Sequence, residues 1–409
     1  MSVSAKTPQA PERIEIVPEL RGSNQSGLRA HNERLVLSLV RRHGELAKAD
    51  IARRTGLSAQ TVSVIMRKLE AEGLLSKGDP IRGKVGQPLV PMHLAPDGAY
   101  FLGLKIGRRS AEMVLIDFLG KVLNRTMSVH HFPTPDGMVA FARDSIETLT
   151  ADLSMGQRGR IAGLGIAMPY QIWEWGDLIG LDPAEMAEWR HRDIRAEIAD
   201  MIDLPVFLQN DASAACGAEL TFGAPHVASS YLYFYFGYFV GGGVVLNGSL
   251  FTGLSDNAGA TGPMPVPDRQ GGLTHLMDVA SLSTLENMLK AQGVETAPMW
   301  LSPTDWPFDD AACAAWIEQA GHALAHAIAS AICVLDFPCI VVDGWMPPAL
   351  RDQLVAEADR VLSNLDTVGL VQPVIEPGRV GPDARALGAA SLPLSERFLL
   401  DTSAILGAY

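Results

Sequence analysis

Two adjacent polar residues, Asn210 and Asp211, have side chains that can bind a compound rich in hydroxyl groups. They follow the apolar run 206–209, which is typical of a strand, and precede the helical stretch 212–219. In α/β proteins, ligand contacts often lie where a strand ends and a helix begins. The amide can hydrogen-bond hydroxyl groups, and the carboxylate can accept a proton from one of them. The alternative is that one of the two residues only caps the helix.

A glycine-rich segment at residues 237–243 could approach a phosphate group. Backbone N–H groups of such a loop can point at phosphate oxygens. A tight turn between two strands explains the same composition equally well, so this segment alone does not indicate phosphate binding.

The N-terminal region has the residue pattern of a helix-turn-helix. Helical stretches are predicted at residues 32–42, 47–55 and 58–72, with Gly56 at the turn that joins the second to the third. Ser58 is a suitable N-cap, because its hydroxyl can accept a hydrogen bond from an unpaired backbone N–H group. A helix-turn-helix also needs apolar residues on the buried side of these helices. The sequence supplies Ile51, Leu57, Val62 and Ile65.

The outer side of the third helix carries side chains that can read DNA. Glutamine can pair with adenine, threonine and alanine can contact the methyl group of thymine, and basic residues suit phosphates. We assign Gln60 and Thr61 to base edges. A β-hairpin wing is expected next, and its basic loop at 82–88 would lie against the DNA backbone or minor groove. The predicted DNA-binding residues are Ser58, Ala59, Gln60, Thr61, Ser63, Arg67, Lys68, Arg82 and Lys84.

The distribution of charge fits a basic DNA reader on an acidic body. The net charge is −13, yet residues 1–95 hold 15 Lys and Arg against 9 Asp and Glu, a balance of +6 that leaves −19 for the rest. Because phosphate neutralisation needs only local positive charge, double-stranded operator DNA is the expected partner. The alternative for the N-terminal helices is a bundle that binds a protein partner or supports the larger domain.

The composition of the 409 residues, 47% hydrophobic and 19% charged, indicates a globular chain of two or three domains. The longest apolar stretch, 231–246, is too short and too rich in glycine to cross a bilayer as a helix. The first residues lack the apolar core of a secretory signal. We therefore expect a cytoplasmic protein that does not bind membranes. The four cysteines form no CxxC pair, so neither a disulfide framework nor a zinc site is expected.

From residue 99 onwards, predicted strands alternate with predicted helices, and this order indicates an α/β body. Asn247 and Gly248 form a strong two-residue hairpin signal. We expect two lobes around a cleft. The predicted strands are 100–106, 113–117, 161–167, 206–209, 231–236, 241–246, 249–251 and 339–342, and the predicted helices are 134–153, 212–219 and 310–335.

The chain resembles the ROK family of repressors, open reading frames and kinases. The resemblance extends over residues 25–398, and the N-terminal reader is similar to that of the family's regulators. It implies an α/β fold: a winged helix-turn-helix at 25–95 and a two-lobed actin-like, ribonuclease H-like domain of the sugar-kinase type. The first lobe would span 98–205, completed by 385–409, and the second lobe 206–384. The motifs that carry the resemblance are 86–88, 161–169, 189–190, 204–206, 210–212, 241–248, 258–262 and 388–390.

The chain departs from the kinases of this family where they bind phosphate. Lys105 stands where the phosphate motif has an aspartate, which opposes Mg²⁺ binding, and Phe239 replaces a glycine of the glycine-rich loop. Phosphoryl transfer depends on positioning and on metal-assisted neutralisation of charge, which Asp211 alone cannot supply. We therefore expect no catalytic residue and no cofactor. The alternative is a working ATP-dependent sugar kinase with an appended DNA-binding segment.

The sugar and zinc elements of the family are altered as well. Ala260 replaces the glutamate that contacts sugar, and Pro263 replaces the histidine that contacts sugar and binds zinc. The loop that should supply cysteines has none and leaves His275 as a lone candidate ligand, so no metal is expected. Asn210 and Asp211 are the retained sugar contacts and our predicted ligand-binding residues.

The resemblance also implies a homodimer or homotetramer, in which two readers face successive major grooves. We expect a repressor whose effector is a small molecule, either a sugar or a sugar derivative. An effector that favours closed lobes over open ones would change the separation of the readers, and operator DNA would weaken effector binding in return.

Overall fold

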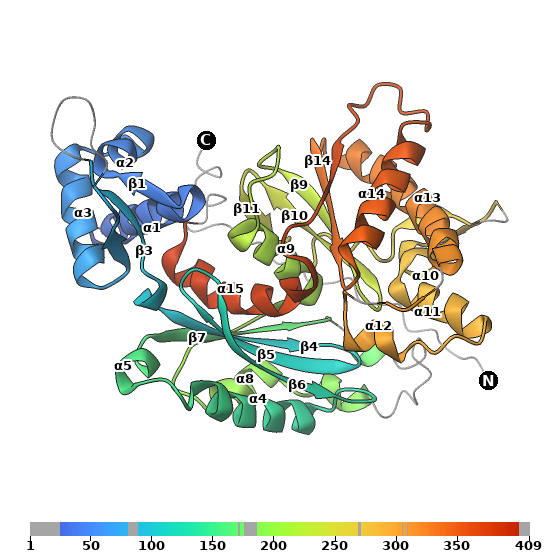
Figure 1. The fold of residues 1–409 in the computed structure, drawn as a ribbon, viewed down its shortest axis with the longest axis horizontal. Coiled ribbons are helices and arrows are strands. Elements are labelled where there is room, and N and C mark those ends of the chain that lie inside the picture. Colours follow the sequence, from blue (N-terminus) through green and yellow to red (C-terminus); the bar gives the residue numbers. More distant parts are fainter. Residues whose placement is uncertain are drawn as a thin grey trace, which may run out of the picture.

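In the computed structural model, the N-terminal domain lies at one end of the molecule, beside two sheets with helices between them (Figure 1). The structure describes residues 25–80, 89–170, 172–175, 186–268, 271–304, 306–308 and 310–400. Within these ranges, no helix has both the length and the apolar character that a membrane crossing requires.

The N-terminal domain combines three helices with a small antiparallel sheet of order β1-β3-β2. The elements are α1 (Gln25–His43), β1 (Glu45–Ala47), α2 (Lys48–Thr55), α3 (Ala59–Ala71), β2 (Leu75–Lys77) and β3 (Pro91–Leu94). Helix α1 begins earlier than the sequence pattern predicted, and β1 was not predicted. The pair β2–β3 forms the base of the predicted wing.

The first lobe is built on a five-stranded sheet of order β6-β5-β4-β7-β8. Its strands are β4 (Tyr100–Ile106), β5 (Ser110–Asp117), β6 (Val122–Val129), β7 (Ile161–Met168) and β8 (Val206–Asn210). Helices α4 (Pro135–Thr150) and α8 (Ile194–Ala199) cover one face, and the short α5 (Met155–Arg158) precedes β7. Successive side chains of a strand point to opposite faces. Leu102 and Leu104 therefore pack under α4 and α8, whereas Lys105 points to the other face.

The second lobe is built on a five-stranded sheet of order β11-β10-β9-β14-β15. Its strands are β9 (Tyr231–Phe236), β10 (Val240–Leu246), β11 (Ser249–Phe251), β14 (Cys339–Gly344) and β15 (Val374–Pro377). An apolar core with the fully buried Trp316 joins one face of this sheet to the outer helices. Those helices are α10 (Leu276–Ala280), α11 (Leu282–Ala291), α12 (Ala297–Leu301), α13 (Asp310–Val334) and α14 (Pro348–Leu362).

Two helices, α9 (Asp211–Phe222) and α15 (Ala384–Phe398), lie between the two sheets (Figure 1). Glycines permit their close approach. A Cβ atom on Gly165 of β7 would lie 1.8 Å from the carbonyl oxygen of Ala389, and one on Gly388 would lie 2.1 Å from that of Ala214. Such positions leave no room for a side chain. Helix α15 is therefore held tightly against both the first sheet and α9.

The N-terminal domain and the first lobe share one hydrophobic core. Val36 and Val40 of α1 belong to the same buried cluster as Phe101, Phe118 and Phe398. The three aromatic rings contact one another, with the edge of Phe398 against Phe118 at a centroid distance of 5.0 Å. Burial of aromatic side chains contributes strongly to stability. The end of α15 and the N-terminal domain are therefore packed as one unit.

Polar contacts also reinforce this shared core, and the backbone N–H of Leu400 donates a hydrogen bond to the hydroxyl of Ser38 on α1 at 2.9 Å. The guanidinium of Arg41 donates a hydrogen bond to the carbonyl oxygen of Phe118 and lies over the rings of Phe118 and Phe222, at 5.4 Å and 5.9 Å from their centroids. Burial lowers the pKa of Arg41 to about 10. The N-terminal domain is thus fixed to the lobe by a buried cation as well as by apolar packing.

Candidate functional sites

Local sequence signals determine where α3, the predicted reader helix, begins and which side of it is buried. The hydroxyl of Ser58 accepts a hydrogen bond from the backbone N–H of Thr61 at 3.1 Å, which confirms Ser58 as the N-cap. Gly56 ends α2 with φ of 70°, a left-handed conformation that favours glycine. Val62, Ile65, Met66 and Leu69 are buried. Together these features fix which side of α3 faces outward.

The outward side of α3 carries most of the predicted DNA-binding residues. Ser58, Ala59, Gln60 and Arg67 are exposed, whereas Thr61 and Ser63 are half-buried. Gln60 and Thr61 line a groove of about 360 Å³ between α1 and α3. The groove also contains residues that the sequence reading missed, Leu28, Arg29, Asn32 and Val64. The three-residue spacing of Arg29 and Asn32 on a helix, where such residues are neighbours, was the signal available.

Lys68 and the wing differ from the other predicted contacts. The ammonium of Lys68 lies 2.7 Å from a carboxylate oxygen of Glu33 and 3.6 Å from one of Glu72. Its charge is therefore partly neutralised by the protein itself. Arg82 and Lys84 lie outside the described residues.

A cavity between the two lobes brings together basic and aromatic side chains from distant parts of the chain. It encloses about 40 Å³. Its walls come from the end of β4 and the loop after it, the loop before β10, α12, the residue after β14 and the start of α15. The lining residues are Lys105, Gly107, Arg108, Arg109, Tyr238, Trp300, Trp345 and Arg385.

Asn210 and Asp211, the predicted ligand-binding pair, both hydrogen-bond to other groups of the protein. The Oδ1 atom of Asn210 accepts hydrogen bonds from the N–H groups of Ala212 and Ser213, at 3.0 Å and 3.2 Å, and so caps α9. The Oδ2 atom of Asp211 accepts a hydrogen bond from Nη1 of Arg385 at 3.3 Å. Capping was the alternative interpretation of this pair, and Asn210 has that role here.

Two basic residues that line the cavity, Lys105 and Arg385, repel each other. Lys105 is only 6% exposed and donates a hydrogen bond to the hydroxyl of Ser110 at 2.9 Å. Burial, together with the charge of Arg385, lowers the pKa of Lys105 to about 7, although Glu112 and Asp211 oppose this effect. Burial would also lower the pKa of Arg385, but Tyr235 and Asp211 outweigh it and raise that pKa above its usual value.

The glycine-rich segment does not form the extended phosphate loop considered from the sequence. Gly241, Gly242 and Gly243 belong to strand β10, so the loop itself contains only Gly237, Tyr238 and Phe239. A Cβ atom on Gly242 would lie 2.5 Å from the backbone of β9. These strand glycines therefore serve close packing. Arg108 lies over the ring of Tyr238 at 3.9 Å, so side chains occupy the space beside this loop.

His275, the histidine considered as a zinc ligand, lies next to Asp278. His275 ends β13 (Leu273–His275), which pairs with β12 (Pro265–Pro267). Its side chain is exposed, and its Nδ1 atom lies 3.5 Å from a carboxylate oxygen of Asp278. Two residues of this kind do not complete a tetrahedral zinc site.

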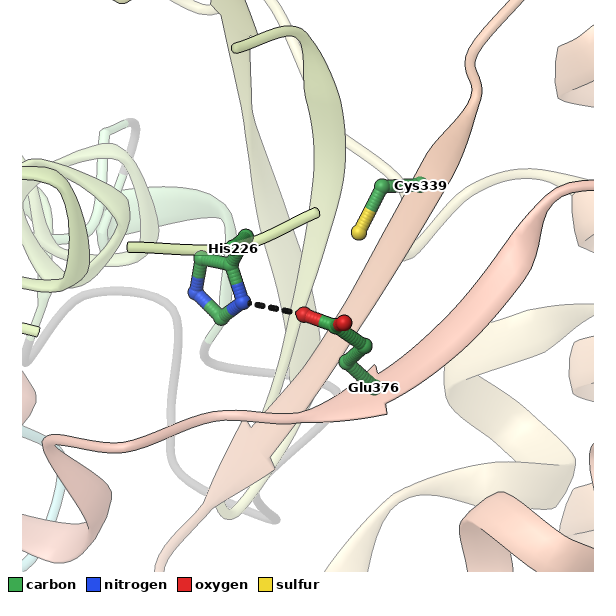
Figure 2. A group of neighbouring side chains, drawn as sticks. All are labelled: His226, Cys339 and Glu376. Atoms are coloured by element: carbon green, nitrogen blue, oxygen red, sulfur yellow. Dashed lines mark hydrogen bonds and ion pairs between the residues drawn. The ribbon is translucent and has the colours of Figure 1, made fainter. Parts of the chain in front are cut away.

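A second cluster of titratable side chains, His226, Cys339 and Glu376, lies in the second lobe (Figure 2). Nδ1 of His226 is 2.6 Å from a carboxylate oxygen of Glu376, and Nε2 is 2.8 Å from one of Glu219. Burial would lower the pKa of His226, but these two hydrogen bonds outweigh it and raise the pKa. With both ring nitrogens facing carboxylates, the imidazolium form satisfies every partner. The cluster ties α9 to β15.

Comparisons with known proteins agree with the two-part architecture. The sequence profile of the ROK family matches residues 101–396, and the profile of winged helix-turn-helix DNA-binding domains matches residues 29–76. An uncharacterized protein of Sinorhizobium fredii, y4fQ, is 25% identical over 383 residues, which cover 90% of this chain and 91% of that protein. The xylose repressor of Bacillus spizizenii is 25% identical over 247 residues, which cover 60% of this chain and 62% of the repressor.

A solved structure shares the fold over nearly the whole chain. It is the crystal structure of a ROK family transcriptional regulator, a homolog of the MLC protein of E. coli. It superposes with a TM-score of 0.64 at 20% identity and covers 91% of this chain and 97% of that one. A winged helix-turn-helix DNA-binding domain therefore precedes a ROK domain, and the chain belongs to the ROK family.

Proposed function

We propose that this protein is a transcriptional repressor that binds operator DNA through α3 and responds to a small molecule bound between its lobes. The observation that carries the proposal is the outer edge of α3, where Gln60 is exposed at the capped helix start and Arg67 is exposed further along the helix. Helix-turn-helix proteins read bases with this part of the helix. The relatives named as repressor and regulator support the same function.

Helix α15 offers a physical route between the two sites. Arg385, near its first residue, lines the inter-lobe cavity, and Phe398, its last residue, packs in the core shared with α1. A helix rises about 1.5 Å per residue, so these residues are roughly 20 Å apart along the axis. A ligand that shifts one end of a packed helix also shifts the other. Coupling of this kind is reciprocal. If the ligand lowers the affinity for DNA, bound DNA also lowers the affinity for the ligand.

We further propose that the protein acts as a homodimer or homotetramer. Two copies of α3 would then enter successive major grooves of a two-part operator. A movement of α15 would change the separation of the two readers. The effector would be a sugar or a sugar derivative, held by the residues of the inter-lobe cavity next to Asp211.

The same site does not favour phosphoryl transfer. Arg385 already donates a hydrogen bond to one of the two carboxylate oxygens of Asp211. Lys105 adds a buried cation where a kinase needs a divalent metal ion, and catalysis of this transfer rests on such metal-assisted positioning. The competing candidate, an active sugar kinase, predicts turnover of ATP with at least one sugar of a panel. Our proposal predicts none.

DNA binding can be tested by the salt dependence of affinity for DNA upstream of the protein's own gene. Each phosphate contact steepens this dependence, so Arg67→Ala should weaken binding to all DNA sequences and reduce the slope by about one. Arg143→Ala is the matched control, because Arg143 is exposed on α4 and pairs only with its neighbour Asp144 among the ion pairs of the described residues. An unchanged slope for Arg67→Ala would favour a module for assembly with other proteins.

A further inference from the structure

Three side chains that can bind a metal ion converge in the second lobe (Figure 2). His226 lies in the loop between α9 and β9, Cys339 begins β14, and Glu376 lies on β15. One ligand atom of each, Nδ1, Sγ and a carboxylate oxygen, lies within 4.8 Å of the other two. The sequence predicted no metal here, because these residues are far apart in the chain and include no CxxC pair.

The pairing of β14 with β15 holds two of the three ligands on one face of the sheet. Cys339 is opposite Val374, and Val341 is opposite Glu376. Because side chains alternate between the two faces along a strand, Cys339 and Glu376 point to the same side. Figure 2 shows the sulfur of Cys339 pointing toward the Glu376 carboxylate. Two paired strands therefore support the sulfur and the carboxylate.

Glu219 of α9 orients the third ligand. Nε2 of His226 lies 2.8 Å from a carboxylate oxygen of Glu219, which also accepts hydrogen bonds of 3.0 Å from the backbone N–H groups of Arg379 and Val380. A histidine that binds a metal ion almost always donates its other ring N–H to a carboxylate, a carbonyl or water, which fixes the ring. His226 has this arrangement, with Nδ1 left to face the other two ligands.

A buried hydroxyl beside the cluster lacks a partner. Tyr231 is 3% exposed, its ring centroid lies 5.2 Å from that of His226, and its Oη atom has no hydrogen-bond partner in the described part of the chain. Burial raises its pKa, and so do the nearby Cys216, Glu219 and Cys339. Buried hydroxyls in folded proteins are nearly always paired. An unpaired one at this place indicates a binding group that the polypeptide does not supply.

We propose that His226, Cys339 and Glu376 bind a zinc ion. Zinc takes imidazole nitrogen, thiolate sulfur and carboxylate oxygen as ligands, and where the protein supplies three of them, water takes the fourth position. The hydroxyl of Tyr231 would hydrogen-bond this water. The ion would join the loop before β9 to β14 and β15 and, through Glu219, would fix the position of α9 between the lobes.

Zinc would replace two protons of the metal-free cluster. In the metal-free protein, a proton on Nδ1 of His226 links it to Glu376 at 2.6 Å. Burial, together with the charge of Glu376, raises the pKa of Cys339 to about 12, so its sulfur is also protonated. A metal ion deprotonates a coordinating thiol, and binding releases the protons to solvent. Because a doubly charged ion replaces two protons, the net charge of the cluster stays the same. His226 therefore titrates only in the metal-free protein.

The positions of the three ligand atoms suit zinc after small side-chain movements. Bonds to zinc are about 2.0–2.3 Å long, so two ligand atoms of a tetrahedral ion lie roughly 3.3–3.8 Å apart. Nδ1 of His226 and the oxygen of Glu376 would separate by roughly 1 Å once no proton links them. Magnesium and calcium prefer oxygen ligands alone, so the nitrogen and sulfur atoms select against them.

The test is isothermal titration calorimetry of the full-length protein, stripped of metal with EDTA and then dialysed. The probes are zinc chloride and magnesium chloride at pH 7.5. We expect one zinc ion to bind per chain with a dissociation constant below about 1 μM, and magnesium to give no binding heat. Absence of zinc binding, or magnesium binding of equal strength, would overturn the assignment.

Variants show whether the cluster is the binding site. Cys339→Ser and Glu376→Gln should each weaken zinc binding by at least about tenfold, because even the loss of an outer hydrogen-bond partner costs a metal site about 10–100-fold. Cys333→Ser and Glu147→Gln, at an exposed cysteine and an exposed glutamate, are the matched controls and should bind as the natural protein does. Equal zinc affinities in all four variants would place the ion elsewhere and refute the site.

Cobalt(II) reports the sulfur ligand without any change to a buried residue, so this measurement decides the question even if Cys339→Ser does not fold. A thiolate bound to cobalt gives an intense charge-transfer absorption in the near ultraviolet. We expect this band in the natural protein and in Cys333→Ser, and its loss when zinc is added. A cobalt complex without the band would contradict the role of Cys339.

Zinc binding is independent of the proposed repressor function. Operator binding that depends on Gln60, in a protein that binds no zinc, would refute the metal site and leave the repressor function standing. Zinc binding without operator binding would do the reverse.

Discussion

Arg385 of α15 donates a hydrogen bond from Nη1 to Oδ2 of Asp211 at the start of α9, across a distance of 3.3 Å. This ion pair joins the two helices that lie between the lobes. It also occupies the carboxylate that a sugar kinase would use, and it lies next to the basic cavity.

Removing the buried charge of Lys105 should stabilise the protein. The pKa of Lys105 is about 7 in the folded state and 10.5 in the reference state, so the unfolded chain binds more protons between these values. Stability therefore rises with pH across this window, and the penalty is largest at or below pH 7. Lys105→Met should gain about 1–3 kcal/mol at pH 7. The gain should shrink toward pH 10.

Chemical denaturation at pH 7 and pH 9 measures this effect. Lys121→Met, at an exposed lysine of the same lobe, is the control and should change stability little. A loss of stability in Lys105→Met at pH 7 would show that the charge is neutralised by the protein.

The close approach of α15 to the first sheet should not tolerate a side chain at Gly165. The Cβ atom of Gly165→Ala would lie 1.8 Å from the carbonyl oxygen of Ala389, which cannot move without shifting the helix. Overpacking should destabilise the protein by more than about 2 kcal/mol. Gly156→Ala is the matched control, because nothing lies within 4 Å of that position. Equal unfolding midpoints for the two variants would rule out a tight α15 contact.

The cluster in Figure 2 should make stability depend on pH. The pKa of His226 is raised above 6.5 in the folded protein, so its stabilising effect is complete below pH 6.5 and is lost as pH rises through the folded value. In His226→Gln this component should be absent, and the stability difference from the natural protein should shrink between pH 6 and pH 8. A pH-independent difference for His226→Gln would mean that its imidazole is neutral.

Arg41 should transmit the effector signal to the reader. Its guanidinium bonds Phe118 and lies over two aromatic rings at the junction of α1 with the first lobe. Arg41→Met should lower the stability by about 1–3 kcal/mol and reduce the effect of an effector sugar on operator affinity. Arg42→Met, at the exposed neighbour, should keep the full effect. The ratio of operator dissociation constants with and without that sugar is the readout, and an unchanged ratio in Arg41→Met would exclude this route.

The sequence was most informative where structure is decided locally. Ser58 caps α3, Gly56 ends α2, and the apolar spacing of Val62 and Ile65 orients the reader helix, as the pattern predicted. Each of these features depends on residues a few positions apart. The alternation of strands and helices likewise predicted an α/β body, although β6, α14 and β15 were missed because their patterns are weakly apolar.

The inter-lobe site could be predicted only in part, because distant residues form it. Lys105 was singled out as a departure from the kinases, but the cation Arg385, whose charge lowers its pKa, comes from a helix 280 positions further along the chain. The ion pair of Lys68 with Glu33 depends in the same way on the packing of α3 against α1. The spacing of residues along the chain predicts neither of these two charge interactions.

The central claim is that Gln60 reads a base of the operator. Its most direct test is fluorescence anisotropy of the full-length protein with DNA upstream of its own gene and with scrambled DNA of equal length. Gln60→Ala should weaken binding to the upstream DNA by about 1–3 kcal/mol, five- to 150-fold, and leave binding to scrambled DNA unchanged. Arg143→Ala should bind both as the natural protein does. Equal loss on both DNAs, or no loss on either, would contradict the account.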